Sequence, residues 1–270
     1  MKIIVASEED PVAKAVATLL GTGEATEHHL GHSRLRHLGG DRYLLRRPGL
    51  HIEDANLGEE VPATLLPHIE AMIFPSVHRS DSNRPALTVH PTGNLTPDAE
   101  VGGRPSALSA VPARLMTEAF LRWHEEGARL GIETTFEATH HGPLLDSPSF
   151  FIEIGSTPKE WEQPRALKAL ADLLLTVEVA RTAADPVVVG VGGGHYMPRF
   201  RDLVRKRKVA VGHLVPSHDL PSLDAAMAAQ LVQRSAGAVG VILAKAADNG
   251  SSSALLRLLP ELHERTLPPR

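Results

Sequence analysis

Short apolar runs alternate with longer amphipathic stretches along most of this chain. Lys2–Ser7 forms the first strand-like run, and Asp10-Pro11 then opens a helix to about Leu20, with Asp as the N-cap and Pro in the first turn. Further strands are predicted at Ile69–Pro75, Ala86–His90, Ile132–Thr139, Phe150–Ile154, Pro186–Val191, Val209–Val215 and Ala238–Ala244. Helices are predicted at Ala110–Leu130, Arg165–Thr182, Leu223–Ser235 and Ala254–Glu264, and Thr157-Pro-Lys-Glu160 has the form of a capping box. This alternation predicts an α/β fold with a mixed, mostly parallel central sheet flanked by helices.

Residues 21–60 interrupt the pattern because they are polar and rich in Gly, His and Arg. Weak strand patterning remains at Tyr43–Leu45 and His51–Ile52, so we expect short strands or loops in a variable peripheral segment. No Pro/Ser-rich linker or repeat divides the chain, which favours one domain over residues 1–270. A separate N-terminal lobe is the alternative.

Composition narrows the class of protein. The 270 residues are 42% hydrophobic but only 4% aromatic, and their net charge of −4 supplies no global basic field for nucleic acid. There is no cysteine, so any metal must be held by His, Asp or Glu. No apolar run approaches the roughly 18 residues that a membrane helix needs. With a first strand at the N-terminus in place of a signal peptide, we expect a cytoplasmic protein without membrane contact.

Histidines follow the ends of several predicted strands. In open α/β sheets, ligands bind beyond the carboxyl ends of the strands. His78, His90, His140, His141 and His195 all lie at or just after such ends. If the strands are parallel, these side chains share one rim of the sheet.

Two acids strengthen this interpretation. Strand alternation places Glu137 and His141 on one face, and Glu153 stands among Phe and Ile residues. A buried acid requires a partner or a metal, although a solvated sheet face would also accommodate both acids. His195 follows three glycines, an arrangement that suits either anion binding or a tight turn. No Gly-x-Ser-x-Gly elbow is present, so acid–base or metal-assisted hydrolysis is favoured over a serine nucleophile.

Six motifs in order resemble one family. They are Ser76-Val-His-Arg-Ser80, Ala86-Leu-Thr-Val-His-Pro-Thr-Gly-Asn94, Gly102-Gly-Arg-Pro105, Glu137-Ala-Thr-His-His-Gly-Pro143, Phe151-Ile-Glu-Ile-Gly-Ser156 and Gly192-Gly-Gly-His-Tyr196. Together they resemble the archaeal-type D-aminoacyl-tRNA deacylases, which have plant relatives. The resemblance covers about residues 1 to 220. It departs at Gly194, where the family pattern is expected to carry a side chain.

The resemblance implies a hydrolase that releases D-amino acids from the 3′ acceptor end of mischarged tRNA, with broad side-chain tolerance. It also implies Zn²⁺, a monomer without an obligate protein partner, and a core similar to peptidyl-tRNA hydrolases and nucleoside phosphorylases. The motif residues expected to hold the metal are His90, Glu137, His141, Glu153 and His195. Those expected in catalysis are His90, Glu137, His140 and His141. Those expected to contact the substrate are His78, Arg79, Ser80, Thr92, Gly93, Asn94, Gly193, Gly194, Tyr196 and Arg199.

Two other functions remain open at this point. A peptidyl-tRNA hydrolase-like enzyme would attack the same end of the RNA but would require an N-blocked peptide. A non-catalytic tRNA-binding protein would require a basic surface with stacking aromatics, which the net charge of −4 and the two Trp and two Tyr residues disfavour.

Overall fold

The computed structural model describes residues 1–22, 27–53, 61, 66–235 and 237–243. Its helices are α1 Pro11–Leu20, α3 Ala113–Leu130, α4 Pro158–Trp161, α5 Pro164–Thr176, α6 Pro198–Arg207 and α7 Ala225–Gln233. Its strands are β1 Lys2–Ser7, β2 Glu27–Leu30, β3 Ser33–Gly39, β4 Arg42–Arg47, β5 Ala71–Arg79, β6 Ala86–His90, β7 Gly93–Asn94, β8 Ala107–Leu108, β9 Glu133–Phe136, β10 Ser149–Ser156, β11 Val187–Val191, β12 Ala210–Val215 and β13 Val241–Leu243.

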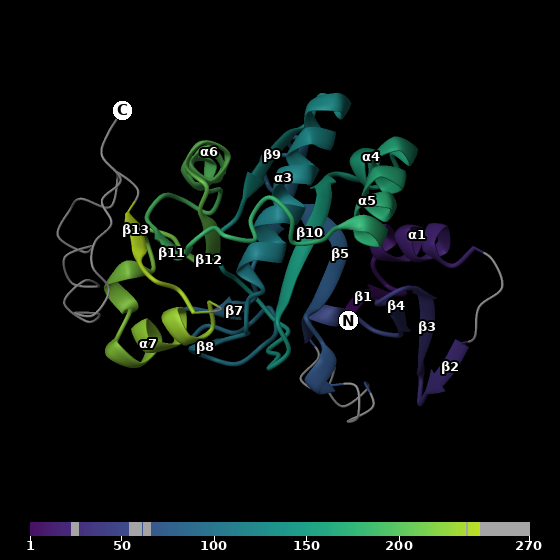
Figure 1. Cartoon of the computed structure of the whole chain (residues 1–270), viewed down its shortest axis with the longest axis horizontal. Coiled ribbons are helices and arrows are strands. Elements are labelled where there is room, and N and C mark those ends of the chain that lie inside the picture. Colours follow the sequence, from purple (N-terminus) through teal and green to yellow (C-terminus); the bar gives the residue numbers. More distant parts are fainter. Residues whose placement is uncertain (23–26, 54–60, 62–65, 236, 244–270) are drawn as a thin grey trace.

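An eight-stranded sheet in the order β2-β3-β4-β1-β5-β10-β6-β9 forms the centre of the molecule (Figure 1). Strands β4, β1, β5 and β10 run parallel to one another, whereas β6 is antiparallel to β10 and parallel to β9. Strands β12, β11 and β13 form a smaller parallel sheet. The predicted α/β fold with a mixed, mostly parallel sheet is therefore confirmed.

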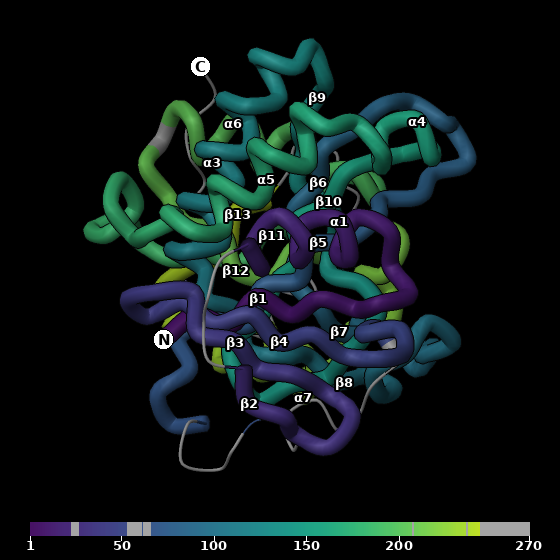
Figure 2. Tube along the Cα trace, turned by 90° about the vertical axis from the view of Figure 1, so that its right-hand side faces the viewer, coloured from purple at the N-terminus to yellow at the C-terminus, as the bar shows by residue number. Residues whose placement is uncertain are grey.

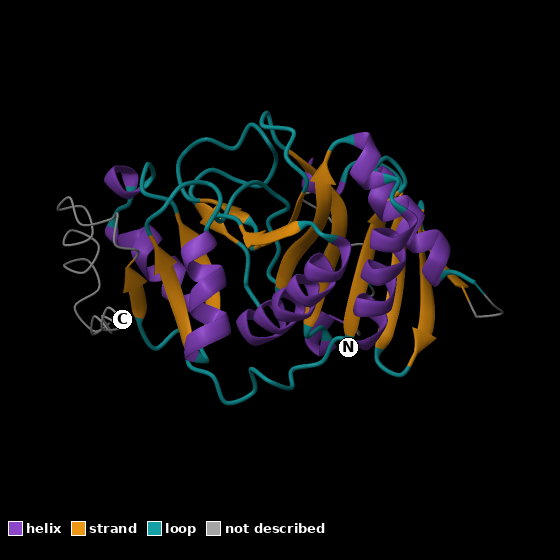
Figure 3. Cartoon of the chain, turned by 90° about the horizontal axis from the view of Figure 1, so that it is seen from above, coloured by secondary structure: helices purple, strands orange, loops and turns teal. Residues whose placement is uncertain are grey.

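Each face of the larger sheet has its own apolar core. On alternate positions, Ile4, Ile73 and Ile152 pack with the apolar residues of α1, α3 and α5. Figure 3 views the molecule from this helix-covered side, with the purple helices lying across the orange strands. The intervening positions Phe74 and Phe151 belong to a smaller second cluster on the other face. That second face also carries Glu153 and is the one on which polar side chains gather.

Helix α3 packs against both sheets. It contacts β6 and β9 of the larger sheet and β12 of the smaller one. Trp123 is fully buried and donates its indole N–H to the backbone oxygen of Glu153 at 3.3 Å. Thr117 accepts a hydrogen bond from the backbone N–H of Val211 at 2.9 Å. The helix therefore fixes the strand that carries Glu153 relative to the smaller sheet.

The N-terminal polar segment is more regular than its sequence predicts. Strands β2, β3 and β4 form an antiparallel meander, and β4 continues the sheet beside β1 (Figure 2). A strand at His51–Ile52 was the wrong interpretation, because His51–Glu53 forms a 3₁₀ turn. His51 in that turn is 1% exposed, and its ring packs against the second face of the sheet.

Other element boundaries differ from the prediction in ways that affect the site. Strand β5 continues through Arg79, so His78 lies inside the strand rather than after it. The basic run after Pro198 forms α6, which the apolar pattern did not predict. The helix predicted at Ala254–Glu264 lies outside the described residues. Within the described part of the chain, no helix combines the length and the apolar character that a bilayer crossing requires.

Candidate functional site

Glu153 stands at the centre of a group of polar side chains on the second face of the sheet. Its side chain is 5% exposed, and one carboxylate oxygen accepts a hydrogen bond of 2.7 Å from the hydroxyl of Thr88. Nδ1 of His78 lies 3.3 Å from the same oxygen, and Nε2 of His90 lies 3.5 Å from the other. Strands β5 and β6 flank β10, so each neighbour contributes one imidazole to this carboxylate.

Glu137 forms a second centre just beyond the end of β9. It is fully buried, and Oε1 lies 3.3 Å from Nδ1 of His78 and 3.2 Å from Nε2 of His195. Among the described residues, neither of its oxygens has a hydrogen-bond partner of good geometry. A buried carboxylate without hydrogen bonds is costly, and a bound cation would satisfy these oxygens.

Three imidazoles present the same nitrogen to the site. Nδ1 of His140 lies 2.8 Å from the carbonyl oxygen of Ala138, and Nδ1 of His141 lies 2.6 Å from that of Gly142. Nδ1 of His90 likewise lies 3.1 Å from the carbonyl oxygen of Pro91. Carbonyl groups only accept, so each Nδ1 carries a proton. Burial keeps His140 and His141 neutral, so their Nε2 atoms keep the lone pair, whereas the neighbouring carboxylates favour the protonated form of His90. This is the arrangement by which proteins orient metal-binding histidines.

Metal-ligating atoms converge in three overlapping groups, in each of which all atoms lie within 4.8 Å of one another. The groups are His90, His140 and His141; Glu137, His140 and His195; and His78, Glu137 and Glu153. Because His140 and Glu137 each belong to two groups, the three form one continuous site, named here the His/Glu cluster. Its composition of imidazole and carboxylate, without thiolate, fits a borderline divalent cation such as Zn²⁺.

Burial sets the protonation of the cluster. Burial lowers the pKa of His141 to about 3, and together with the neighbouring imidazoles it lowers that of His140 well below its usual range. For Glu153, burial opposes ionisation, but His78 and His90 reverse the effect and hold the pKa of its carboxyl well below the usual range. Burial likewise opposes protonation of His78 and His90, yet the two carboxylates raise the pKa of both imidazoles.

The chain around His141 is held in an uncommon conformation. Its φ of 41° lies in the left-handed region, which non-glycine residues seldom adopt. The backbone N–H of Gly93 donates to the carbonyl oxygen of His141 at 2.8 Å, and Thr92 pairs with His140 in an isolated bridge. Gly142 follows without a side chain because a Cβ there would lie 2.3 Å from the backbone of Gly103. The surrounding loops thus fix both histidines.

The structure brings together every residue predicted to hold metal or catalyse. These are His90, Glu137, His140, His141, Glu153 and His195. They do not share a rim of parallel strands, however, because β6 runs opposite to β10. Strand β10 lies between β5 and β6, and β9 lies beyond β6, so the side chains converge over the face of the sheet. The side chain of His195 is 49% exposed and lies at the entrance.

The predicted substrate residues divide between two hollows beside the cluster. One, of about 750 Å³, is lined by His78, Arg79, Ser80, Asp81, Asn83, Ser156, Thr157, Pro158, Trp161, His195 and Tyr196. The other, of about 200 Å³, is lined by Gly93, Asn94, Leu95, Thr96, Asp98, Glu100, Val101, Thr139, His140, His141 and Asp219.

The remaining predicted contacts are less exposed or lie further along the chain. Thr92 is buried, with its hydroxyl 3.3 Å from that of Ser149. The backbone N–H of Gly193 donates to the hydroxyl of Ser217, and the backbone N–H of Gly93 donates to the carbonyl oxygen of His141. Neither N–H can therefore donate to the oxyanion that forms when the ester is attacked. Gly194 is exposed beside His195, and Arg199 is exposed at the start of α6.

His51 and Trp161 also lie at the site, although no sequence pattern indicated them. The ring centroid of His51 lies 5.1 Å from that of Phe151, which in turn stacks parallel to His90 at 5.1 Å. Burial lowers the pKa of His51 to about 4, so it is a neutral ring beneath the cluster. A lone histidine in a polar segment carries no periodic signal, and Trp161 follows a capping box that predicts only a helix start.

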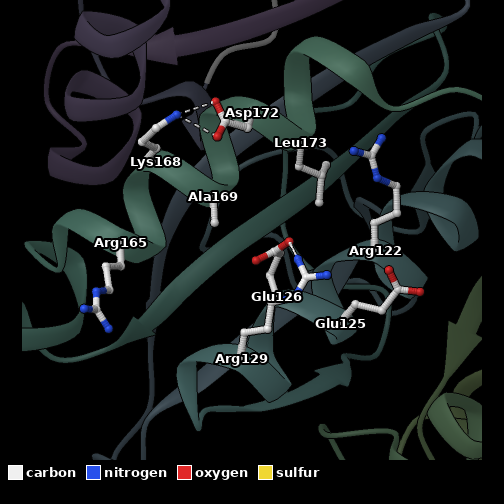
Figure 4. A pocket seen from close by; sticks show the side chains of 9 residues that line it. All are labelled: Arg122, Glu125, Glu126, Arg129, Arg165, Lys168, Ala169, Asp172 and Leu173. Atoms are coloured by element: carbon white, nitrogen blue, oxygen red, sulfur yellow. Dashed lines mark hydrogen bonds and ion pairs between the residues drawn. The ribbon is translucent and has the colours of Figure 1, made fainter.

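A third hollow lies between α3 and α5, on the helix-covered side (Figure 4). Its volume is about 480 Å³, and its charged side chains largely neutralise one another, as in the pairs Arg129–Glu126 and Lys168–Asp172. It contains no histidine and no buried acid. The candidate site is therefore the His/Glu cluster and the two hollows that flank it.

Comparison with known proteins agrees with this chemistry. The family model described as D-aminoacyl-tRNA deacylase matches residues 66–265. A D-aminoacyl-tRNA deacylase of Thermoplasma acidophilum is 34% identical, with 93% of each chain covered. One of Methanosarcina mazei is 35% identical over 81% of this chain and 73% of its own length.

A solved structure shares the fold. The crystal structure of a conserved protein of unknown function superposes with a TM-score of 0.82 at 28% identity, covering 95% of this chain and 90% of that one. With the family model spanning most of the sequence and relatives above 30% identity over nearly all of it, this chain belongs to the D-aminoacyl-tRNA deacylase family.

Proposed function

We propose that this protein hydrolyses the ester bond of D-aminoacyl-tRNA and releases the free D-amino acid and tRNA. Family membership supports the substrate. The observation that carries the reaction is the buried His/Glu cluster, in which His140 and His141 present an unprotonated Nε2 and in which, among the described residues, the carboxylate of Glu137 lacks hydrogen bonds. Ester hydrolysis needs an activated water and a proton donor for the leaving oxygen, and such a cluster supplies the groups for both.

Zn²⁺ is the metal that suits this donor set. His90, Glu137, His141, Glu153 and His195 would hold it, and Glu137 and His90 have buried polar atoms that no hydrogen bond satisfies. When bound, zinc lowers the pKa of water at the site and polarises a carbonyl oxygen. Direct metal analysis of the purified protein tests the assignment.

The chain's own groups perform the remaining tasks. Thr88 and the two imidazoles beside Glu153 hold this carboxylate in place, and the backbone carbonyls behind His140 and His141 fix their tautomers. Glu137, His90, His140 and His141 are the proposed catalytic groups, and those of them that do not hold the metal would accept a proton and return it to the leaving ribose oxygen.

Positive side chains near the larger hollow would contact the RNA. Arg79 at the end of β5 and Arg199 at the start of α6 are both exposed. Contacts of this kind fix the position of the RNA without reading its sequence. We expect the protein to act in the cytoplasm as a monomer, which size-exclusion chromatography with light scattering tests.

A comparison of substrates tests the function. We expect rapid release of the amino acid from D-aminoacyl-tRNA, with slow turnover of L-aminoacyl-tRNA and of N-acetylaminoacyl-tRNA. Preference for the N-blocked substrate would identify a peptidyl-tRNA hydrolase-like enzyme instead. Binding of tRNA without release from any of the three would identify a non-catalytic tRNA-binding protein.

Variants connect the activity to the cluster. Glu137→Gln and His141→Ala should each lower kcat by about 100-fold or more, since each removes a metal ligand or proton acceptor. Glu133→Gln is the matched control, because this exposed glutamate lies four residues before Glu137 at the start of β9. If Glu137→Gln or His141→Ala retained full deacylation, the catalytic assignment would be wrong even with the substrate correct.

A further inference from the structure

The larger hollow beside the cluster contains a preformed stacking surface. The guanidinium carbon of Arg79 lies over the ring of Trp161, 5.1 Å from its centroid, which is a cation–π contact. Trp161 is half-buried and donates its indole N–H to the carbonyl oxygen of His78 at 3.1 Å. Arg79 is exposed, and both side chains line the hollow. The proposed function assigns Arg79 a general contact with the RNA and gives Trp161 no role.

We propose that this hollow binds the terminal nucleoside of the tRNA, with its base stacked on the Arg79–Trp161 pair. This inference rests on the proposed function and assigns the orientation of its substrate. Proteins that bind unpaired nucleotides stack the bases on aromatic rings or on arginine guanidinium planes. A volume of about 750 Å³ lies within the range of small-molecule sites and accommodates a nucleoside.

The stacking surface is held rigidly next to the catalytic cluster. Trp161 ends α4, which opens with a capping box in which both Thr157 and Glu160 are engaged. The hydrogen bond from Trp161 to the backbone of His78 ties this helix to β5. His78 belongs to the cluster through Nδ1, and its Nε2 lies 2.6 Å from the hydroxyl of Tyr196. A ribose beside Tyr196 would therefore place its acylated hydroxyl at the cluster while the base reaches Arg79.

The smaller hollow on the other side of the cluster does not suit a nucleotide. At about 200 Å³ it is too small for a nucleoside, and it is lined by the carboxylates of Asp98, Glu100 and Asp219 without a lysine or arginine. Like charges there repel the RNA phosphates. Size and charge therefore both favour the larger hollow, which contains Arg79, as the site of the terminal nucleoside of the tRNA.

The two tryptophans of the chain provide a direct test. Trp123 is fully buried under the sheet, whereas Trp161 lines the hollow, so a base that stacks there changes the fluorescence of Trp161 alone. The probe is the D-alanyl amide of 3′-amino-3′-deoxyadenosine, which has no phosphate and resists hydrolysis. We expect it to quench the wild-type protein and to inhibit deacylation competitively. Trp161→Phe should lose the quenching and retain the melting temperature of the wild type.

Kinetics separate stacking from a phosphate contact. Arg79→Met and Trp161→Leu should each raise KM about 5- to 150-fold, the equivalent of 1–3 kcal/mol of base stacking, with kcat changed far less. The same rise should appear with D-alanyl-adenosine as a minimal substrate, because the surface contacts only the terminal nucleoside. Arg129→Ala is the control for the loss of an exposed arginine, and it should leave KM unchanged.

The outcomes distinguish this inference from the proposed function. If the wild type deacylates D-aminoacyl-tRNA but the amide neither quenches nor competes, the nucleoside lies elsewhere and the inference is overturned. Quenching without competition would identify a separate nucleoside site and would also overturn it. A rise in KM with full-length tRNA but not with D-alanyl-adenosine would reassign Arg79 to a phosphate. A wild type without deacylase activity refutes the function itself.

Discussion

His213 should make the protein lose stability in acid. It is fully buried in β12, where Nδ1 lies 3.0 Å from the hydroxyl of Thr139 and Nε2 lies 3.0 Å from the carbonyl oxygen of Ser109. Thr139 immediately precedes His140, so this neutral imidazole braces the segment that carries the histidine pair. Burial lowers its pKa from 6.5 to about 3.

The direction and size of the effect follow from this pKa. Between the two values the unfolded chain binds one proton that the folded chain refuses, so stability falls as the pH falls below 6.5. At about pH 5 the loss is about 2 kcal/mol relative to neutral pH, and it reaches about 4 kcal/mol near pH 3. The contribution of His213 is complete only above the pKa of the unfolded chain.

His213→Gln removes the pH-dependent contribution of His213 to stability, because a glutamine side chain does not titrate. It still offers a donor to the carbonyl oxygen of Ser109 and an acceptor to the hydroxyl of Thr139. Urea unfolding of both proteins, after removal of metal by chelation, gives the stability at about pH 7.5 and about pH 5. We expect the difference between the two pH values to be about 2 kcal/mol smaller in the variant. His218→Gln, at an exposed position, should behave as the wild type. An equal acid-induced loss in His213→Gln and in the wild type would refute the reasoning.

Three further predictions concern the site. In Gly155→Ala the new Cβ would lie 2.5 Å from the Cβ of His78, so this variant should lower kcat/KM by about 100-fold. Gly127→Ala creates an equally tight overlap in α3, away from the cluster, so it should lower the melting temperature but change the activity little. Glu153→Gln should lower the zinc content measured by mass spectrometry and reduce kcat/KM by at least about 10- to 100-fold, and retention of a full complement of zinc would contradict its assignment as a ligand. Arg205 is exposed in the basic run of α6, the helix that begins beside Arg199. Arg205→Ala should weaken binding of deacylated tRNA and reduce the slope of log K against log salt by about one in filter-binding titrations. An unchanged slope would exclude a phosphate contact there.

The sequence predicted the members of the cluster better than their arrangement. Glu137, His140 and His141 lie close in the chain, but β9 ends at Phe136, so the loop after this strand sets their arrangement. The prediction from strand alternation that Glu137 pairs with His141 was wrong, because Glu137 lies with His140 and His195 instead. The contacts of Glu153 depend on which strands neighbour β10 and in which direction they run. No local pattern encodes that β6 is antiparallel to β10, and the assumption of parallel strands therefore placed the histidines on a rim rather than on a face.

Residues without a periodic signal could not be predicted. His51 lies in a polar segment and reaches the site only because a 3₁₀ turn places it against Phe74 and Phe151. Strand β5 contains Ser76, His78 and Arg79, which interrupt the apolar pattern, and its continuation past Pro75 follows from pairing with β10. Tertiary pairing overrides local propensity in strands, so polar functional residues inside a strand are read as a loop.

The position of the cluster also explains how the fold tolerates it. Buried carboxylates and imidazoles reduce stability unless partners neutralise them, and Glu137 and His90 retain unsatisfied atoms. The opposite face of the same sheet bears the large apolar core with α1, α3 and α5, which offsets that cost. The ligating atoms come from β5, the ends of β6 and β9, the middle of β10 and the turn after β11. Their convergence thus requires the larger sheet to be paired and the smaller one docked, so metal binding must follow folding rather than nucleate it.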